Sequence, residues 1–368
     1  MQKVKTQIIR IDKDSSKWNG QVHELEWAAK LLTEGRIGAF PTETVYGLGA
    51  LATDEKAVER IYEVKGRDRR NPLIVHVASI NDAIKLTTEF NDTAMTLANT
   101  FWPGPLTMVL PKNACIPSVT TSGLDTVGIR MPDNAIALEL IRLAGPIAAP
   151  SANESSLPSG TTARDVKKDL NGKIDFIIDG GPSGIGVEST IIDLTTDVPT
   201  ILRKGGLPIE EIREALEMTG SVRIDPSIAG GKASETPKAP GMMFKHYSPK
   251  YATVIAFAHN GSRLQTLHMM DQKGEELKAE GKKVVFIFSG QILPRMRDRM
   301  MKFGEVCAFS DAWQLGRHLF RKYREFDEKR TFILVEEAED YGIGCAVNDR
   351  IRISANGNIV KPTTYPIR

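Results

Sequence analysis

The segment FPTETVYGLG, which begins at Phe40, places three hydroxyl groups and a carboxylate between a proline and a pair of glycines. Small apolar residues typical of a strand precede it, and a helical pattern that Asp54 could cap follows it. Hydroxyl groups at a strand-to-helix crossover often line a ligand pocket, but they also stabilise turns by local hydrogen bonds. On this segment alone a turn is the better interpretation.

A second segment, KGRDRRNPLIVHV, begins with Lys65, Arg67, Arg69 and Arg70 at the expected end of a helix. Cations there can simply complement the helix dipole in solvent. They can also clamp phosphates, because a guanidinium makes bidentate contacts and an ammonium adds a point charge. The pattern does not choose between these roles. His76 follows inside an apolar strand, where a histidine is more often a packed core residue than a ligand.

Three further segments combine hydroxyls with glycines or a cation. APSANESSLPSGTTARDV contains Ser151, Asn153 and Ser159, and it is either a flexible serine-rich loop or a nest of amides and hydroxyls around an anion. GIGVESTIIDL contains Ser189, and ILRKGG ends a strand at Arg203. Each signal is weak by itself.

Composition and charge exclude several classes of protein. The chain has 368 residues, of which 41% are hydrophobic and 26% charged, so it is a globular protein long enough for two domains. A net charge of +2 does not indicate a dedicated nucleic-acid binder. The three cysteines are far apart, which fits a reducing compartment and no metal pair. With neither a signal-peptide core nor a long apolar run, we predict a cytoplasmic protein without membrane contact.

Several catalytic motifs are missing from the sequence. It has no phosphate-binding loop of the Gly-x-x-x-x-Gly-Lys-Ser/Thr type, no Gly-x-Ser-x-Gly elbow and no His-Glu-x-x-His zinc helix. No pair of carboxylates stands out for acid–base chemistry. The sequence therefore argues against ordinary P-loop chemistry.

The alternation of apolar runs and helical patterns predicts an α/β protein with two domains. Residues 1–218 form a twisted mixed sheet with helices, in which Thr161 or Thr162 could cap a helix. Residues 219–251 are rich in Pro, Gly, Ser and Lys and form an extended linker. Residues 252–368 form a smaller parallel, Rossmann-like α/β domain.

Taken in order, the segments resemble the YrdC-like domain, and the linker APGMMFKHYSP with the following module resembles the two-domain threonylcarbamoyl-AMP synthase family. The resemblance covers nearly the whole chain, and the ordered set of segments is specific although no single one is. It implies that L-threonine, bicarbonate and ATP are combined into L-threonylcarbamoyl-adenylate and pyrophosphate. This product leads to N6-threonylcarbamoyladenosine at position 37 of tRNAs.

The resemblance also implies roles for individual residues. A catalytic tetrad would consist of Lys65, Arg67, Ser151 and Asn153. Threonine would be bound by Thr42, Tyr46, His76, Arg130 and Ser189. In addition to the tetrad, ATP would contact Thr121 or Ser122, Ser159, Arg203, His246 and Tyr247, with the last two reaching from a linker that folds over the active site.

The resemblance implies no tightly bound cofactor and no metal site made by the protein. Mg²⁺ would bridge the phosphates of ATP, which is a substrate. A tRNA-modifying transferase complex would use the product, and weak binding of tRNA to the basic segment is a further expectation.

Two other functions stay open at this point. One is a different carbamoyl-adenylate enzyme, because hydrogenase-maturation proteins contain a related domain, although this chain has no Cys-x-x-Cys pair. The other is a non-catalytic RNA-binding protein that uses the basic segment from Lys65 to Arg70. The absence of aromatic residues among these cations argues against recognition of single strands.

Overall fold

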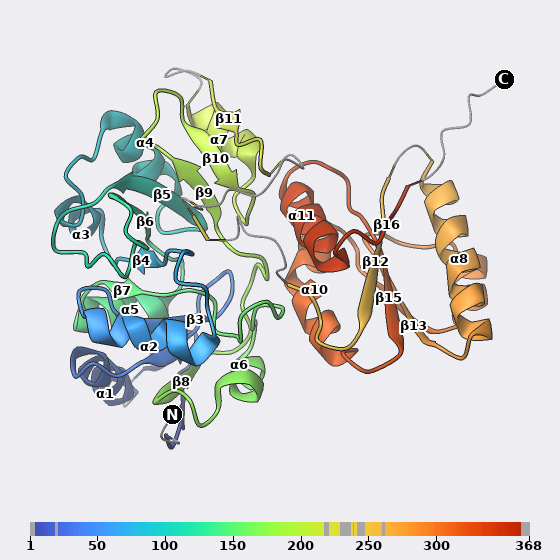
Figure 1. Cartoon of the computed structure of the whole chain (residues 1–368), viewed down its shortest axis with the longest axis horizontal. Coiled ribbons are helices and arrows are strands. Elements are labelled where there is room, and N and C mark those ends of the chain that lie inside the picture. Colours follow the sequence, from blue (N-terminus) through green and yellow to red (C-terminus); the bar gives the residue numbers. More distant parts are fainter. Residues whose placement is uncertain are drawn as a thin grey trace. The chain divides into compact units, whose positions relative to one another are not determined.

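The computed structural model of the chain describes residues 4–18, 21–216, 221–228, 237, 239–240, 247–259 and 262–361. The chain forms two compact units (Figure 1). The first contains Met1–Ser155 and Ser159–Phe244, and the second contains Ser156–Pro158 and Lys245–Arg368. Domain boundaries at residues 218 and 251, and a linker folded over the site, stay predictions.

The first unit is built on an 11-stranded mixed sheet in the order β1-β8-β2-β3-β7-β4-β6-β5-β9-β10-β11. Its strands are β1 (Gln7–Arg10), β2 (Gly38–Phe40), β3 (Gly47–Leu51), β4 (Ile74–His76), β5 (Leu106–Pro111), β6 (Thr126–Arg130), β7 (Ile147–Ala148), β8 (Phe176–Asp179), β9 (Thr190–Asp193), β10 (Thr200–Arg203) and β11 (Arg223–Ile224). Parallel pairs such as β4/β6 and β5/β9 alternate with antiparallel pairs such as β5/β6. The predicted mixed α/β fold is confirmed.

Most helices of this unit begin at a side chain that caps them. They are α1 (Val22–Thr33), α2 (Glu55–Lys65), α3 (Ile80–Lys85), α4 (Asp92–Phe101), α5 (Ala135–Ala144), α6 (Ala163–Leu170) and α7 (Ile209–Ala215), with a short 3₁₀ turn at Ser15–Lys17. The Asp54 carboxylate accepts a hydrogen bond from the amide of Ala57, and Thr162 forms a capping box with Asp165. Both predicted caps are confirmed.

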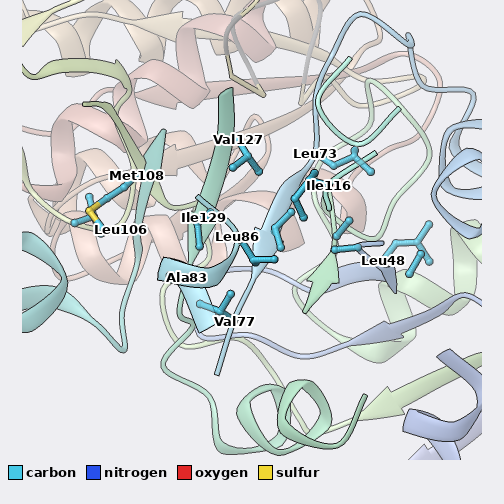
Figure 2. Close-up of a cluster of buried hydrophobic side chains, with 14 of the residues drawn as sticks. Leu48, Leu73, Val77, Ala83, Leu86, Leu106, Met108, Ile116, Val127 and Ile129 are labelled. Atoms are coloured by element: carbon cyan, nitrogen blue, oxygen red, sulfur yellow. The ribbon is translucent and has the colours of Figure 1, made fainter. Parts of the chain in front are cut away.

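A buried apolar cluster fixes the sheet against its helices. It contains Leu48 of β3, Leu106 and Met108 of β5, Ile129 of β6, and Val77, one residue after β4 (Figure 2). Each of these side chains is almost completely buried. Burial of a side chain of this size contributes about 1.5–3 kcal/mol, so the strand ends that carry the polar residues rest on a rigid base.

Strand β3 corrects the prediction of a direct strand-to-helix crossover after Phe40. Its glycine-rich sequence resembles a turn, but it pairs with both β2 and β7. A Cβ atom at Gly49 would lie 2.8 Å from the ring of Phe40, so the missing side chain is what lets this ring pack across the strand.

Strand β11 lies within the segment that we predicted to be the linker. Arg223 and Ile224 pair in parallel with Thr200 and Ile201 of β10, so this part of the segment extends the sheet. Residue 239 is also part of the first unit, because the Ala239 side chain is buried with Ile74, Val109, Ile191 and Leu202.

The second unit contains a fully parallel sheet in the order β14-β13-β15-β12-β16. Its elements are β12 (Thr253–Phe257), α8 (Arg263–Ala279), β13 (Lys283–Phe288), α9 (Pro294–Met300), β14 (Glu305–Ala308), α10 (Ala312–Glu325), β15 (Thr331–Glu336), α11 (Ile343–Ala355) and β16 (Ile359–Val360). Helix α8 covers one face of the sheet, and α10 and α11 cover the other (Figure 1). The predicted Rossmann-like domain is confirmed. None of the helices in the described ranges is long and apolar enough to cross a membrane.

Candidate active site

Four neighbouring strands of the first unit bring together residues that are far apart in the sequence. His76 of β4 is in register with Arg130 of β6, and Arg130 is in register with Thr107 of β5. Strand β9 lies beside β5 and begins one residue after Ser189. His76 and Arg130, which we predicted to bind threonine, therefore lie side by side on adjacent strands. Ser189, predicted for the same substrate, lies on the far side of β5 and contacts Thr107.

Arg130 forms a buried ion pair with a carboxylate that our site prediction did not include. Its Nη2 atom lies 2.5 Å from Oε1 of Glu43, and its Nε donates to the carbonyl of Gly104 at 3.3 Å. The exposed fractions of the two side chains are 4% for Arg130 and 12% for Glu43. The segment around residue 43 thus supplies a charge to the site as well as a turn.

Arg203 and Ser189 are joined directly. The Arg203 guanidinium donates to the carbonyl oxygen of Ser189 at 2.9 and 3.0 Å and to its hydroxyl at 3.1 Å. The Ser189 hydroxyl lies 2.8 Å from that of Thr107. We predicted that Ser189 binds threonine and that Arg203 binds ATP. Their direct contact means that the two predicted binding regions adjoin each other here.

Lys65 links the end of α2 to the loop after β7. Its ammonium donates to the backbone carbonyls of Ser151 at 2.6 Å and Asn153 at 2.5 Å. In return the Lys65 carbonyl accepts from the amide of Ser155 at 3.0 Å. Three of the four predicted tetrad residues are thus in direct contact, although Lys65 is 86 and 88 residues away from the other two.

Arg67, the fourth member of the predicted tetrad, forms hydrogen bonds with the segment that leads into β4. Its Nε and Nη2 atoms donate to the carbonyls of Asn71 and Pro72 at 3.1 and 2.9 Å. The side chain is only 9% exposed. Arg69 and Arg70 are exposed instead, and they pair with Glu59 and Asp68.

Thr42 and Tyr46 are anchored within their own loop region. The Thr42 hydroxyl donates to the carbonyl of Val45 at 2.6 Å and accepts from two nearby amides, which is the turn role considered above. The Tyr46 hydroxyl donates to the carbonyl of Gly181 at 2.7 Å. Both side chains are buried, so the loop is rigidly held beside the strand ends.

One of the predicted ATP residues of the first unit, Thr121, lines a narrow hollow. The Thr121 hydroxyl donates to the Leu124 carbonyl, and Ser122 has a positive φ of 55°. Thr121 lines the hollow together with apolar side chains, including Ile74 and Ile191, and with Ala239 and Pro240. The carbonyl of Pro240 accepts a hydrogen bond from Arg203 at 3.2 Å.

Ser159 is bound to a second acidic residue that our site prediction did not include. Its hydroxyl donates to Oε1 of Glu188 at 2.6 Å, and both side chains are buried. Glu188 directly precedes Ser189 in the sequence. The hydrogen bond from Ser159 to Glu188 therefore holds the Ser159 loop close to the contact between Ser189 and Arg203.

Tyr247 lies in the second unit. Its ring stacks on Phe320 at a centroid distance of 5.3 Å, and the guanidinium carbon of Arg350 lies 5.1 Å from the ring centre. His246 lies outside the described residues. Contacts of both residues with ATP stay predictions.

The site is strongly cationic for a buried region. Lys65, Arg67, Arg130 and Arg203 are each at most 9% exposed. Burying cations is costly unless anions or carbonyl groups compensate them. Carbonyl groups and Glu43 do so here, and an anionic ligand would find these cations already in place.

Burial holds His76 in its neutral form. Desolvation lowers the pKa of His76 to about 3, and the positive charge of Arg130 contributes to the decrease. Its Nδ1 atom has no hydrogen-bond partner among the described residues. His76 is therefore a neutral imidazole throughout the physiological range and can bind a ligand without carrying a charge.

This shift of the His76 pKa predicts a pH dependence of stability. Below pH 6.5 the unfolded chain binds a proton at His76 that the folded chain does not bind until about pH 3. Stability should therefore decrease as the pH falls through this window, by about 1.4 kcal/mol per pH unit for this group. Urea unfolding at pH 7, 6, 5 and 4 should show a shallower decrease for His76→Gln than for the wild type.

The exposed His23 provides the matched control, because its side chain is 88% exposed. His23→Gln should have the same pH slope as the wild type. Equal slopes for the wild type and His76→Gln would show that His76 does not titrate as a buried neutral residue.

Comparisons with known proteins place the chain in a family. A family model described as telomere recombination matches residues 30–205, and one described as the C-terminal domain of threonylcarbamoyl-AMP synthase matches residues 207–356. The threonylcarbamoyl-AMP synthase of Pyrococcus abyssi is 44% identical over 358 residues, which cover 97% of this chain and 99% of that protein. This chain belongs to the threonylcarbamoyl-AMP synthase family.

Other members of the synthase family agree along the length of the chain. The Bacillus subtilis threonylcarbamoyl-AMP synthase is 41% identical over 345 residues, or 92% of this chain and 94% of that protein. The crystal structure of P. abyssi Sua5 complexed with L-threonine matches with a TM-score of 0.87 and 45% identity, and the match covers 97% of this chain and 100% of that one. The resemblance recognised in the sequence is confirmed.

Sequence reasoning did not select Glu43, Thr107 or Glu188 as site residues. Glu43 and Glu188 were visible in segments already singled out, but a lone carboxylate within a loop has no spacing signal. Thr107 is one hydroxyl within an apolar strand. Only the pairing of β5 with β6 and β9 brings Thr107 beside the site.

Proposed function

We propose that this chain combines L-threonine, bicarbonate and ATP to form L-threonylcarbamoyl-adenylate and pyrophosphate, the first step of N6-threonylcarbamoyladenosine formation. Similarity to the synthases spans both units. The observation that carries the proposal is a chain of contacts between the two groups of predicted site residues. Arg203 donates to Ser189, the Ser189 hydroxyl contacts that of Thr107, and Thr107 lies on the strand that pairs with the strand of Arg130. A cation for phosphate, on β10, is thus linked through Ser189 and Thr107 to the strand that pairs with β6, which carries the cation for a carboxylate.

The cations divide naturally between the two substrates. Arg130 is the partner for the threonine carboxylate, because a guanidinium can bind two oxygens at once. His76, Ser189, Thr42 and Tyr46 would complete the threonine site. Arg203, Lys65 and Arg67 would bind the triphosphate, with Ser151, Asn153, Ser159 and Thr121 or Ser122 supplying uncharged contacts.

The reaction can proceed by positioning and charge stabilisation. The threonine nitrogen bonds to the carbon of carbon dioxide derived from bicarbonate, and an oxygen of the resulting carbamate attacks the α-phosphorus of ATP. The bond to the β-phosphate oxygen breaks, and pyrophosphate leaves with its charge stabilised by Lys65 and Arg67.

We expect Mg²⁺ to enter this site as a companion of ATP. Groups of three or more His, Cys, Asp or Glu side chains that could hold a metal do not occur within the described ranges. The ion would neutralise part of the triphosphate charge, as divalent ions do in other phosphate chemistry.

The direct experiment is to incubate the pure chain with ATP, Mg²⁺, bicarbonate and L-threonine and to measure pyrophosphate together with the mass of the adenylate. Reactions without threonine or without bicarbonate serve as controls. Pyrophosphate and a threonylcarbamoyl-AMP mass should appear only when both are present. Pyrophosphate formed equally in either control would refute the proposed reaction.

The alternative of a dedicated RNA-binding face gains little from the structure. Lys65 and Arg67 are buried, while Arg69 and Arg70 are paired with carboxylates, so the basic segment does not form a uniform cationic surface. RNA affinity without adenylate formation would favour this alternative. Another carbamoyl-adenylate acceptor would instead give pyrophosphate that does not depend on threonine.

We further propose that the adenylate is used by a tRNA-modifying transferase complex in the cytoplasm. The three free cysteines, Cys115, Cys307 and Cys345, fit a reducing compartment. Addition of that complex and tRNA to the reaction should consume the adenylate.

A further inference from the structure

The buried pair of Arg130 and Glu43 raises a question that the proposed function does not answer. Arg130 is assigned to the carboxylate of the amino acid, but its guanidinium is already 2.5 Å from the Glu43 carboxylate. If the substrate carboxylate takes this guanidinium, then a buried negative charge at Glu43 loses its partner. Leaving a charge buried without compensation is strongly unfavourable.

The amino acid itself carries the charge that resolves this difficulty. Its zwitterion has one carboxylate and one ammonium, and the pair of Arg130 and Glu43 is the complementary arrangement of one cation and one anion. When the substrate binds, its carboxylate pairs with Arg130 and its ammonium pairs with Glu43. Every charge therefore keeps a partner of opposite sign. A site with Arg130 alone would instead gain a net positive charge in a buried position.

Glu43 retains the capacity for new hydrogen bonds. Neither of its carboxylate oxygens receives a hydrogen bond of ordinary geometry from the described residues, although the ion pair is short. The backbone of Glu43 is fixed, because its carbonyl accepts from the amide of Ile185 at 2.8 Å. The carboxylate is thus held in place while its oxygens can accept N–H donors from a ligand.

We propose that Glu43 binds the ammonium group of the amino-acid substrate, exchanging Arg130 for it when the substrate carboxylate arrives. This inference rests on the proposed function and adds a specificity residue to it. Glu43 also accepts the proton that must leave before the nitrogen reacts. An N–H bond breaks as an O–H bond forms on Glu43, and the lone pair of the neutral amine then bonds to the carbon of carbon dioxide. The nitrogen loses its second proton to water, which leaves the carbamate.

The test compares two ligands without any turnover. Isothermal titration would measure the affinity for L-threonine and for (2S,3R)-2,3-dihydroxybutanoate, in which a hydroxyl replaces the amine. The wild type should bind threonine about 10- to 100-fold more tightly, because a charged hydrogen-bonded pair is lost in the analogue. In Glu43→Gln this preference should shrink to within about threefold, since the carboxamide carries no charge.

Two controls separate this role from a merely structural ion pair. Glu89→Gln, at an exposed position, should keep the wild-type preference. Affinity for ATP should be unchanged in Glu43→Gln, whereas a general loss of structure would weaken both substrates. If Glu43→Gln does not fold, the wild type alone still tests the proposal, because equal affinity for threonine and the analogue would overturn it.

The outcomes also distinguish this inference from the proposed function. A wild type that makes threonylcarbamoyl-AMP, together with a Glu43→Gln variant that keeps the full preference for the amine, would overturn the role of Glu43 alone. A wild type that neither binds threonine nor forms the adenylate would overturn both.

Discussion

Lys65→Met should lower kcat/KM for adenylate formation by at least about 100-fold, which is the usual cost of removing one charged group that stabilises a transition state. The methionine keeps most of the aliphatic stem but has no ammonium. Initial rates of pyrophosphate release over a range of ATP concentrations, with bicarbonate and L-threonine saturating, would measure the effect.

The same change should also lower stability. The Lys65 ammonium donates to the carbonyls of Ser151 and Asn153, and its loss removes a charged donor from both. A buried acceptor that loses its partner costs about 1–3 kcal/mol. The sequence alone gives no sign of this structural role, so thermal unfolding must accompany the kinetics.

Lys56→Ala is the matched control, because Lys56 lies on the same helix at an exposed position. It should keep both the wild-type rate and the wild-type melting temperature. A folded Lys65→Met protein that turns over like the wild type would remove Lys65 from the mechanism.

Gly205→Ala should destabilise the first unit by about 3 kcal/mol or more, because it forces a methyl group into the backbone of a neighbouring segment. A Cβ atom there would lie 2.2 Å from the carbonyl carbon of Ser189 and from the amide nitrogen of Thr190. Both contacts are with main-chain atoms, which cannot rotate away as the end of a flexible side chain can.

Chemical denaturation would measure this loss, and ATP binding should weaken with it, since Ser189 accepts the hydrogen bonds of Arg203. Gly184→Ala is the control, because a Cβ atom at that position would have its nearest neighbour 3.8 Å away. That change should stay within about 1 kcal/mol of the wild type. Equal stability of the two variants would show that the backbone near Ser189 yields easily.

Local sequence determined much of the secondary structure. Asp54 and Thr162 cap the helices that they were predicted to cap, since a cap depends on residues only three positions apart. Strand β3 was missed for a physical reason. Its glycines favour a turn when taken alone, and the packing of Phe40 across Gly49 outweighs that preference.

The site could be predicted only in part. The resemblance of short segments to the synthase family pointed to Lys65, Ser151 and Asn153. In the structure the Lys65 ammonium donates hydrogen bonds to the carbonyls of the other two. The pairing of Glu43 with Arg130 has no local signal, because the two residues meet only through the order of strands in the sheet.

The sequence by itself therefore determined the family and the fold class, and it predicted the cations of the candidate site. The tertiary structure decided which anion each cation meets. Strands β4, β6, β5 and β9 are neighbours in the sheet, but only β5 and β6 follow each other in the chain, so the partners of Arg130 and Ser189 depend on contacts between distant segments. Charge compensation in a buried site is a property of these contacts, and no short stretch of sequence contains it.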